Sequence, residues 1–149
     1  MGYAAQDQLE AWITANQLSM LDRLADDDPD IPTFVFLHNP FVMHENGYNF
    51  ASEKANIYEL IYNRSAVRAR LERMNTQLVH SGHVYQQQDV NSTTMNGIEY
   101  TIGDHFYRYG DTNLGDVRWL NVDESAQSAT LSYYDFGAGA QSDLTTVTW

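Results

Sequence analysis

The sequence contains no cysteine, which excludes disulfides, thiolate metal sites and cysteine nucleophiles. It also lacks any apolar run close to the roughly 20 residues that a membrane-spanning helix needs, so we expect no membrane partner. Residues 1–8 do not have the basic-then-apolar order of a secretory signal. If this start is the natural one, the sequence predicts a cytoplasmic protein.

Basic residues are scarce. There are 8 Lys and Arg against 20 Asp and Glu, the formal net charge is −12, and Lys54 is the only lysine. Nucleic-acid binding normally requires a basic face, so a nucleic-acid partner is disfavoured. An acidic surface with almost no lysine is typical of proteins from very salty cytoplasm, where ions screen self-repulsion. The alternative is an ordinary acidic protein.

The length of 149 residues indicates one domain, 1–149. A hydrophobic fraction of 43% with 13% aromatics is enough for a packed core and argues against general disorder. The acidic stretch "ADDDPD", residues 25–30, has no EF-hand spacing and is interpreted as a solvated loop between two structured segments.

Ahead of this loop, the sequence predicts a helix from about Ala15 to Ala25. Thr14 and Gln17 have the spacing of a capping box. Apolar residues recur at helical spacing, at Leu18, Leu21 and Leu24.

Two short apolar runs predict strands, Thr33 to Leu37 and Thr76 to His80, each buried on both faces. Residues 56–75 between them have a helical pattern, in one or two pieces. Asn56 and Glu59 form the capping box expected for the first piece, and Ser65 is the cap expected for the second. The inner face of the second piece is formed by Val67, Leu71 and Met74.

After the second strand the hydrophobic period changes to two. The segments "GIEYTIGDHF", "VRWLNVD" and "ATLSYYDFG" predict three more strands, separated by glycine-containing turns such as Asn96-Gly97. The order is therefore α-β-α-β followed by an antiparallel meander, which is an α/β fold with a β ending.

Histidines follow both apolar strands. In parallel α/β sheets, functional groups collect at the carboxyl ends of the strands. If a right-handed helical crossover makes the two strands neighbours about 4.8 Å apart, His38 and His83 can share one metal ion. Gly82 fits this picture because it removes side-chain bulk where a ligand or another backbone comes close.

The other histidines have simpler interpretations. His80 is expected to face the core or to pack beneath a loop, and His44 and His105 to be surface or packing residues. Ser81 lies beside His80, but neighbouring residues of a strand point to opposite faces, so Ser81 is interpreted as a turn serine rather than a nucleophile.

The segments "FVFLHNPF" and "LVHSGHVY" together resemble the C-terminal half of calcineurin-like metallophosphoesterases, the superfamily of the purple acid phosphatases. That family has a strand ending in His-x-Pro, then a helix, then a strand ending in Gly-His-x-His. The helix before the first segment and the three strands after the second also match in order. The resemblance covers about residues 14–136.

The resemblance implies two packed sheets with outer helices and a site for two metal ions, commonly among Mn, Fe, Zn and Ni. Those ions activate water and hold a phosphate-ester substrate. His38 and His83 would bind the same ion. Tyr85 stands where the family has the histidine that binds the other ion. Further contacts to metal or substrate are assigned to Tyr85, Asn39 and His44, and no catalytic residue is assigned.

The family's N-terminal motifs, which supply the remaining ligands, do not precede His38. We therefore expect an incomplete domain, which is a phosphoesterase portion that gains activity with its N-terminal half. A complementary chain or a homo-oligomer would cover the interrupted sheet. The alternative is a non-catalytic binding or structural module that has lost its metals. A self-sufficient hydrolase with one metal, held by residues among His38, His83, His44 and Asp104, ranks last.

Overall fold

The computed structural model describes residues 13–39, 63–82, 91–102 and 116–149. Within these residues the elements, in chain order, are α1 (Ala15–Asp27), β1 (Thr33–Leu37), α2 (Arg64–Leu71), β2 (Thr76–Ser81), β3 (Asn91–Met95), β4 (Ile98–Ile102), β5 (Asp116–Asp123), β6 (Ser128–Asp135) and β7 (Ala140–Thr148). The order α-β-α-β predicted for the first half is confirmed. No helix in the described ranges is long and apolar enough to cross a membrane.

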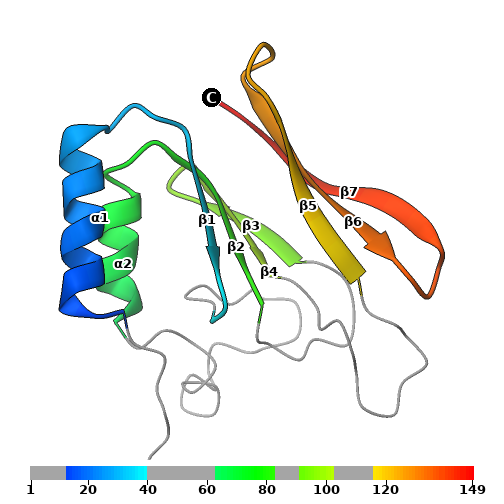
Figure 1. Ribbon diagram of the computed structural model, residues 1–149, viewed down its shortest axis with the longest axis horizontal. Helices are drawn as coiled ribbons and strands as arrows, with labels where there is room; N and C mark the ends of the chain where they lie inside the picture. The colour runs from blue at the N-terminus through cyan, green and yellow to red at the C-terminus, as the bar shows by residue number, and fades with distance from the viewer. Residues whose placement is uncertain (1–12, 40–62, 83–90, 103–115) are drawn as a thin grey trace, which may run out of the picture.

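Four strands form a mixed sheet in the order β1-β2-β4-β3 (Figure 1). β1 and β4 flank β2 and both run parallel to it, whereas β3 pairs antiparallel with β4. The prediction that β4 begins the meander is therefore wrong. β4 joins the mixed sheet because its alternate residues Ile98 and Tyr100 are buried in the core of that sheet.

β3 and β4 form a tight hairpin through Asn96 and Gly97, which confirms the turn predicted there. Both residues have positive φ, 52° and 81°, as a two-residue hairpin turn of the primed type requires. β3 itself was not predicted, because the sequence NSTTM has almost no apolar residue from which to recognise a strand.

The second sheet is an antiparallel meander in the order β5-β6-β7. β5 and β6 confirm two of the predicted strands, and the turn around Gly139, with φ of 64°, separates β6 from β7. β7 was missed, since its polar sequence AQSDLTTVT is exposed along much of its length. The antiparallel meander at the end of the chain is thus confirmed, but it consists of β5, β6 and β7 and does not include β4.

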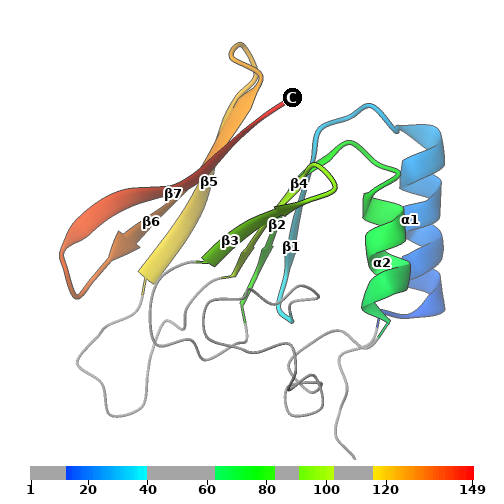
Figure 2. The ribbon, with the colours of Figure 1, turned by 180° about the vertical axis from the view of Figure 1, so that it is seen from behind.

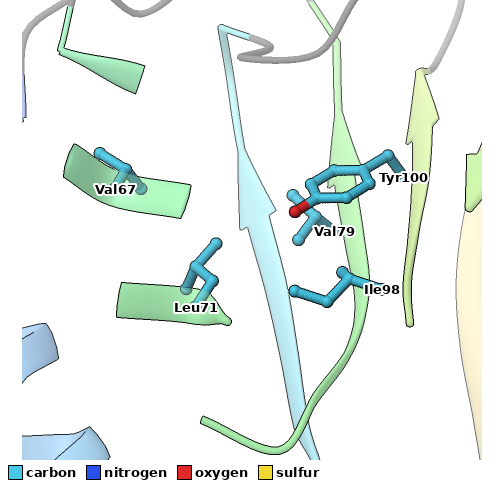
Figure 3. Close-up of a cluster of buried hydrophobic side chains, with 5 residues drawn as sticks. All are labelled: Val67, Leu71, Val79, Ile98 and Tyr100. Atoms are coloured by element: carbon cyan, nitrogen blue, oxygen red, sulfur yellow. The ribbon is translucent and has the colours of Figure 1, made fainter. Parts of the chain in front are cut away.

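The elements form three layers, with α1 and α2 on one face of the mixed sheet and the meander on the other side (Figures 1 and 2). The core between helices and sheet contains Val67 and Leu71 of α2 facing Val79, Ile98 and Tyr100 (Figure 3). The inner face predicted for α2 is confirmed, because Met74 also packs against this cluster. This packing fixes α2 as the crossover that makes β1 and β2 parallel neighbours.

The capping box of α1 is present: the Thr14 hydroxyl accepts from the Gln17 amide, and the Gln17 side chain accepts from the Thr14 amide. The cap predicted at Ser65 is wrong, because α2 begins at Arg64 and Asn63 is its N-cap residue. The Asn63 side chain binds both the amide and the carbonyl of Ile13, at 3.1 and 2.8 Å, and so joins the starts of the two helices. The cap predicted at Asn56 and Glu59 lies outside the described residues.

Ion pairs also join α1 to α2 and to the residues just after α2. Arg70 donates to Asp22 at 2.9 Å, and Arg73 binds both Asp22 and Asp26. These partly exposed pairs add less to stability than the apolar core does. They use two of the few basic residues to offset the acidic face of α1.

The expectation that β1 is buried on both faces is wrong. β1 is the terminal strand of the mixed sheet, none of its residues is fully buried, and Phe36 is 57% exposed. Its apolar sequence resembles that of a central strand, but within the described residues only β2 pairs with it. β2 is the buried strand, with strands on both sides.

Candidate functional site

The candidate site is the edge of the mixed sheet where three parallel strands end. Because β1, β2 and β4 run in the same direction, their carboxyl ends lie at the same edge of the sheet. β2 is the middle strand of the three. Ligand sites of α/β sheets lie at such carboxyl edges.

The residues after β1 and β2 are held side by side by the backbone. Leu37 is the register partner of Ser81, and the Gly82 amide donates to the His38 carbonyl at 3.0 Å. His83 is the next residue in the chain, and consecutive Cα atoms are about 3.8 Å apart. The prediction that these two segments are neighbours is confirmed, but the contact between imidazoles remains a prediction because His83 lies outside the described residues.

The remaining predicted contacts divide in the same way. His38 is exposed and Asn39 is half-buried at this edge, and each has interactions with its surroundings. Tyr85 and His44 lie outside the described residues. Among the residues that the structure describes, no three His, Asp or Glu side chains are grouped as metal ligands.

The space around Gly82 is less restricted than the sequence suggested. A Cβ placed there would meet only the His38 carbonyl oxygen among described atoms, at an ordinary contact distance of 3.9 Å. The backbone of β1 therefore does not require a glycine here.

His80 lies on the face of β2 opposite the helices, as a packed residue. Its Nδ1 is 2.7 Å from the hydroxyl oxygen of Thr101, its register partner on β4, and its ring makes an edge contact with Phe36, 6.0 Å between centroids. Burial, and secondarily the charge of Arg118 on β5, lowers the pKa of His80 to about 4. The expectation that His80 is a packing residue is confirmed, and at neutral pH it is uncharged.

Ser81 is a buried strand residue and not a turn serine. Its hydroxyl donates to the Thr101 carbonyl at 3.3 Å. That bond holds β2 to β4 close to the candidate edge.

Two features of this site could not be predicted from the sequence. The first is that β4 also ends at this edge, since strand order is not encoded in local periodicity. The second is Arg118, whose charge acts on His80 from the other sheet. The inward position of Arg118 on β5 could have been inferred only with the sheet pairing known.

A scan against protein-family models finds no matching family, and a search of curated proteins finds no relative.

Proposed function

We propose that the chain is the metal-binding C-terminal portion of a phosphate-ester hydrolase of the metallophosphoesterase type. In this proposal His38 and His83 hold one metal ion at the carboxyl edge of β1 and β2. The resemblance of the strand-end motifs is the source of the idea. The observation that carries it is the 3.0 Å hydrogen bond from the Gly82 amide to the His38 carbonyl, which joins the two motifs.

The donor chemistry supports the proposal. Imidazole nitrogen is a good ligand for Zn, Fe, Mn or Ni, and His38 is exposed at the edge. When bound, such ions polarise a phosphate ester and supply hydroxide as nucleophile. The part that this chain plays is to hold one ion in position at the edge of the sheet. We assign the bridging carboxylate and the remaining ligands to the complementary half of the domain.

The test is metal content together with hydrolysis of a chromogenic phosphate ester, measured on the wild type and on Tyr85→His. We expect Tyr85→His to bind more Mn or Zn, because it restores the histidine that the family has at this place. A matched control is Tyr134→His, which adds a histidine on β6. Hydrolysis should be absent from the chain alone and appear when the complementary half is added.

Equal metal uptake by the two variants would contradict the proposal, since any added histidine would then have the same effect. Hydrolysis that persists in the isolated chain after His83→Ala would contradict it as well. In that case the activity would not use this edge.

The alternative is a non-catalytic binding or structural module built on the same fold. The observation that favours it is Tyr85 itself, because a neutral phenol with a pKa near 10 is a poor ligand for Zn or Mn. Stoichiometric metal that is lost in His38→Ala and His83→Ala would rule out this alternative.

A further inference from the structure

The outer edge of β1 differs from the other strand edges in the described part of the protein. Its sequence TFVFL has no charged residue, and the exposed Phe36 lies on it. The edge strands of the meander, β5 and β7, both contain aspartate, and β3 at the opposite edge of the mixed sheet is mostly polar. Natural edge strands are usually protected by charge, proline or bulges, because an open apolar edge pairs with other strands.

We propose that β1 pairs with β1 of a second copy of this chain, antiparallel and across a two-fold axis at Val35. The sequence of β1 is self-complementary in this register. Phe34 lies opposite the partner's Phe36, Val35 opposite the partner's Val35, and Thr33 opposite the partner's Leu37. Such an arrangement is an isologous interface, in which the same surface of each copy meets itself.

The side chains on each face agree with this register. Phe34 contacts Trp149 edge-on with a centroid distance of 5.6 Å, and Phe36 contacts His80 on the same face of the sheet. Self-pairing therefore joins the aromatic groups of the two copies into one row and covers Phe36. Cross-strand aromatic pairs of this kind stabilise antiparallel sheets. The axis is perpendicular to the sheet, so the helix layers of both copies stay on one side.

The antiparallel orientation keeps the most acidic segments of the two copies apart. The exposed aspartates 26, 27, 28 and 30 lie just before β1, at its amino end. Antiparallel pairing puts the two acidic segments at opposite ends of a five-residue strand, about 17 Å long. That separation exceeds the Debye length of about 10 Å at 0.1 M salt. Since each copy carries a formal charge of −12, the dimer should become tighter as KCl is raised.

The first experiment is sedimentation equilibrium of the full chain in dilute and concentrated KCl. We expect a dimer in concentrated KCl, loss of that dimer in Phe36→Lys, and retention in Val122→Lys. Val122 is a matched control because it is 50% exposed and lies on β5. Both substitutions lower the net negative charge equally, so added repulsion cannot explain a difference. Circular dichroism checks that Phe36→Lys is folded.

The second experiment tests the register by cross-linking, in a chain that has no cysteine of its own. Residues directly opposite in an antiparallel pair have Cα atoms about 4.5–5.5 Å apart, within the range of a disulfide. Val35→Cys should therefore form a disulfide-linked dimer on mild oxidation. The Cα atoms of the two copies of Thr33 would be about 14 Å apart, too far for a disulfide, so Thr33→Cys should stay monomeric.

A monomeric wild type under all conditions would overturn the proposal. A dimer that survives Phe36→Lys, or equal cross-linking of the two cysteine variants, would overturn it too. None of these outcomes depends on metal binding or on phosphate-ester hydrolysis.

Discussion

The environment of His80 predicts that protonation of this residue lowers the free energy of unfolding in acid. The imidazole lies between the two sheets, close to Thr101 and Phe36, and its pKa falls from 6.5 to about 4. The first cause is burial, which disfavours the charged ring, and the second is the positive charge of Arg118. Between these two pKa values, His80 therefore binds a proton in the unfolded chain but not in the folded protein.

The sign and size follow from linkage. Between pH 6.5 and pH 4 the unfolded state binds a proton at this position and the folded state does not, so the free energy of unfolding falls as the pH falls. At 1.36 kcal/mol for each pKa unit, the loss is about 3 kcal/mol by pH 4. This is a large part of the roughly 5–15 kcal/mol by which small domains are stable.

The assay is urea unfolding followed by circular dichroism at constant salt, from pH 7 to pH 4, on the wild type and His80→Gln. Carboxylates titrate in both proteins, so the informative quantity is the difference in unfolding free energy between them. We expect this difference to change by about 3 kcal/mol in favour of the variant as the pH falls. A difference that is independent of pH, or an imidazole that titrates near 6.5 by NMR, would refute the reasoning.

Two further predictions concern the packing of the helices. Leu71→Ala empties a fully buried position and should lower the free energy of unfolding by about 2–5 kcal/mol, whereas Leu24→Ala, at a side chain that is 42% exposed, should change it by about 0.5 kcal/mol or less. Asn63→Ala removes both hydrogen bonds to Ile13 and should cost about 1–3 kcal/mol, while Ser65→Ala should be nearly neutral because Ser65 is not the cap. Urea titration at neutral pH measures both pairs; a loss in Leu24→Ala as large as in Leu71→Ala, or in Ser65→Ala as large as in Asn63→Ala, would contradict the assigned roles.

The elements that the sequence predicted well are those whose local chemistry leaves few choices. The capping box of Thr14 and Gln17 marked the start of α1, and the apolar run of 33–37 marked β1 with its observed bounds. In contrast, β3 and β7 were missed because hydrogen bonds to a neighbouring strand, rather than apolar side chains, hold much of their length. The hydrophobic periodicity of a sequence does not show which strands pair through their backbones.

At the candidate site, too, some features could be predicted from the sequence and others could not. The order of motifs predicted that the segments ending in His38 and Gly82 are neighbours, and the backbone bond between them confirms it. The burial of β1 was predicted wrongly, because apolar composition alone cannot distinguish a central strand from an edge strand. The environment of His80 also depends on Arg118, which is 38 positions away in the sequence and comes close only through sheet packing.

The central claim is that His38 and His83 bind the same metal ion, and a double-mutant cycle tests it most directly. Zn²⁺ affinity would be measured by calorimetry at constant salt for the wild type, His38→Ala, His83→Ala and the double variant, with His80→Gln as the control. If both imidazoles bind one ion, either single substitution should abolish most of the affinity, the second should add little, and His80→Gln should bind as the wild type does. Independent, additive losses, or Zn²⁺ binding that neither substitution changes, would contradict the claim.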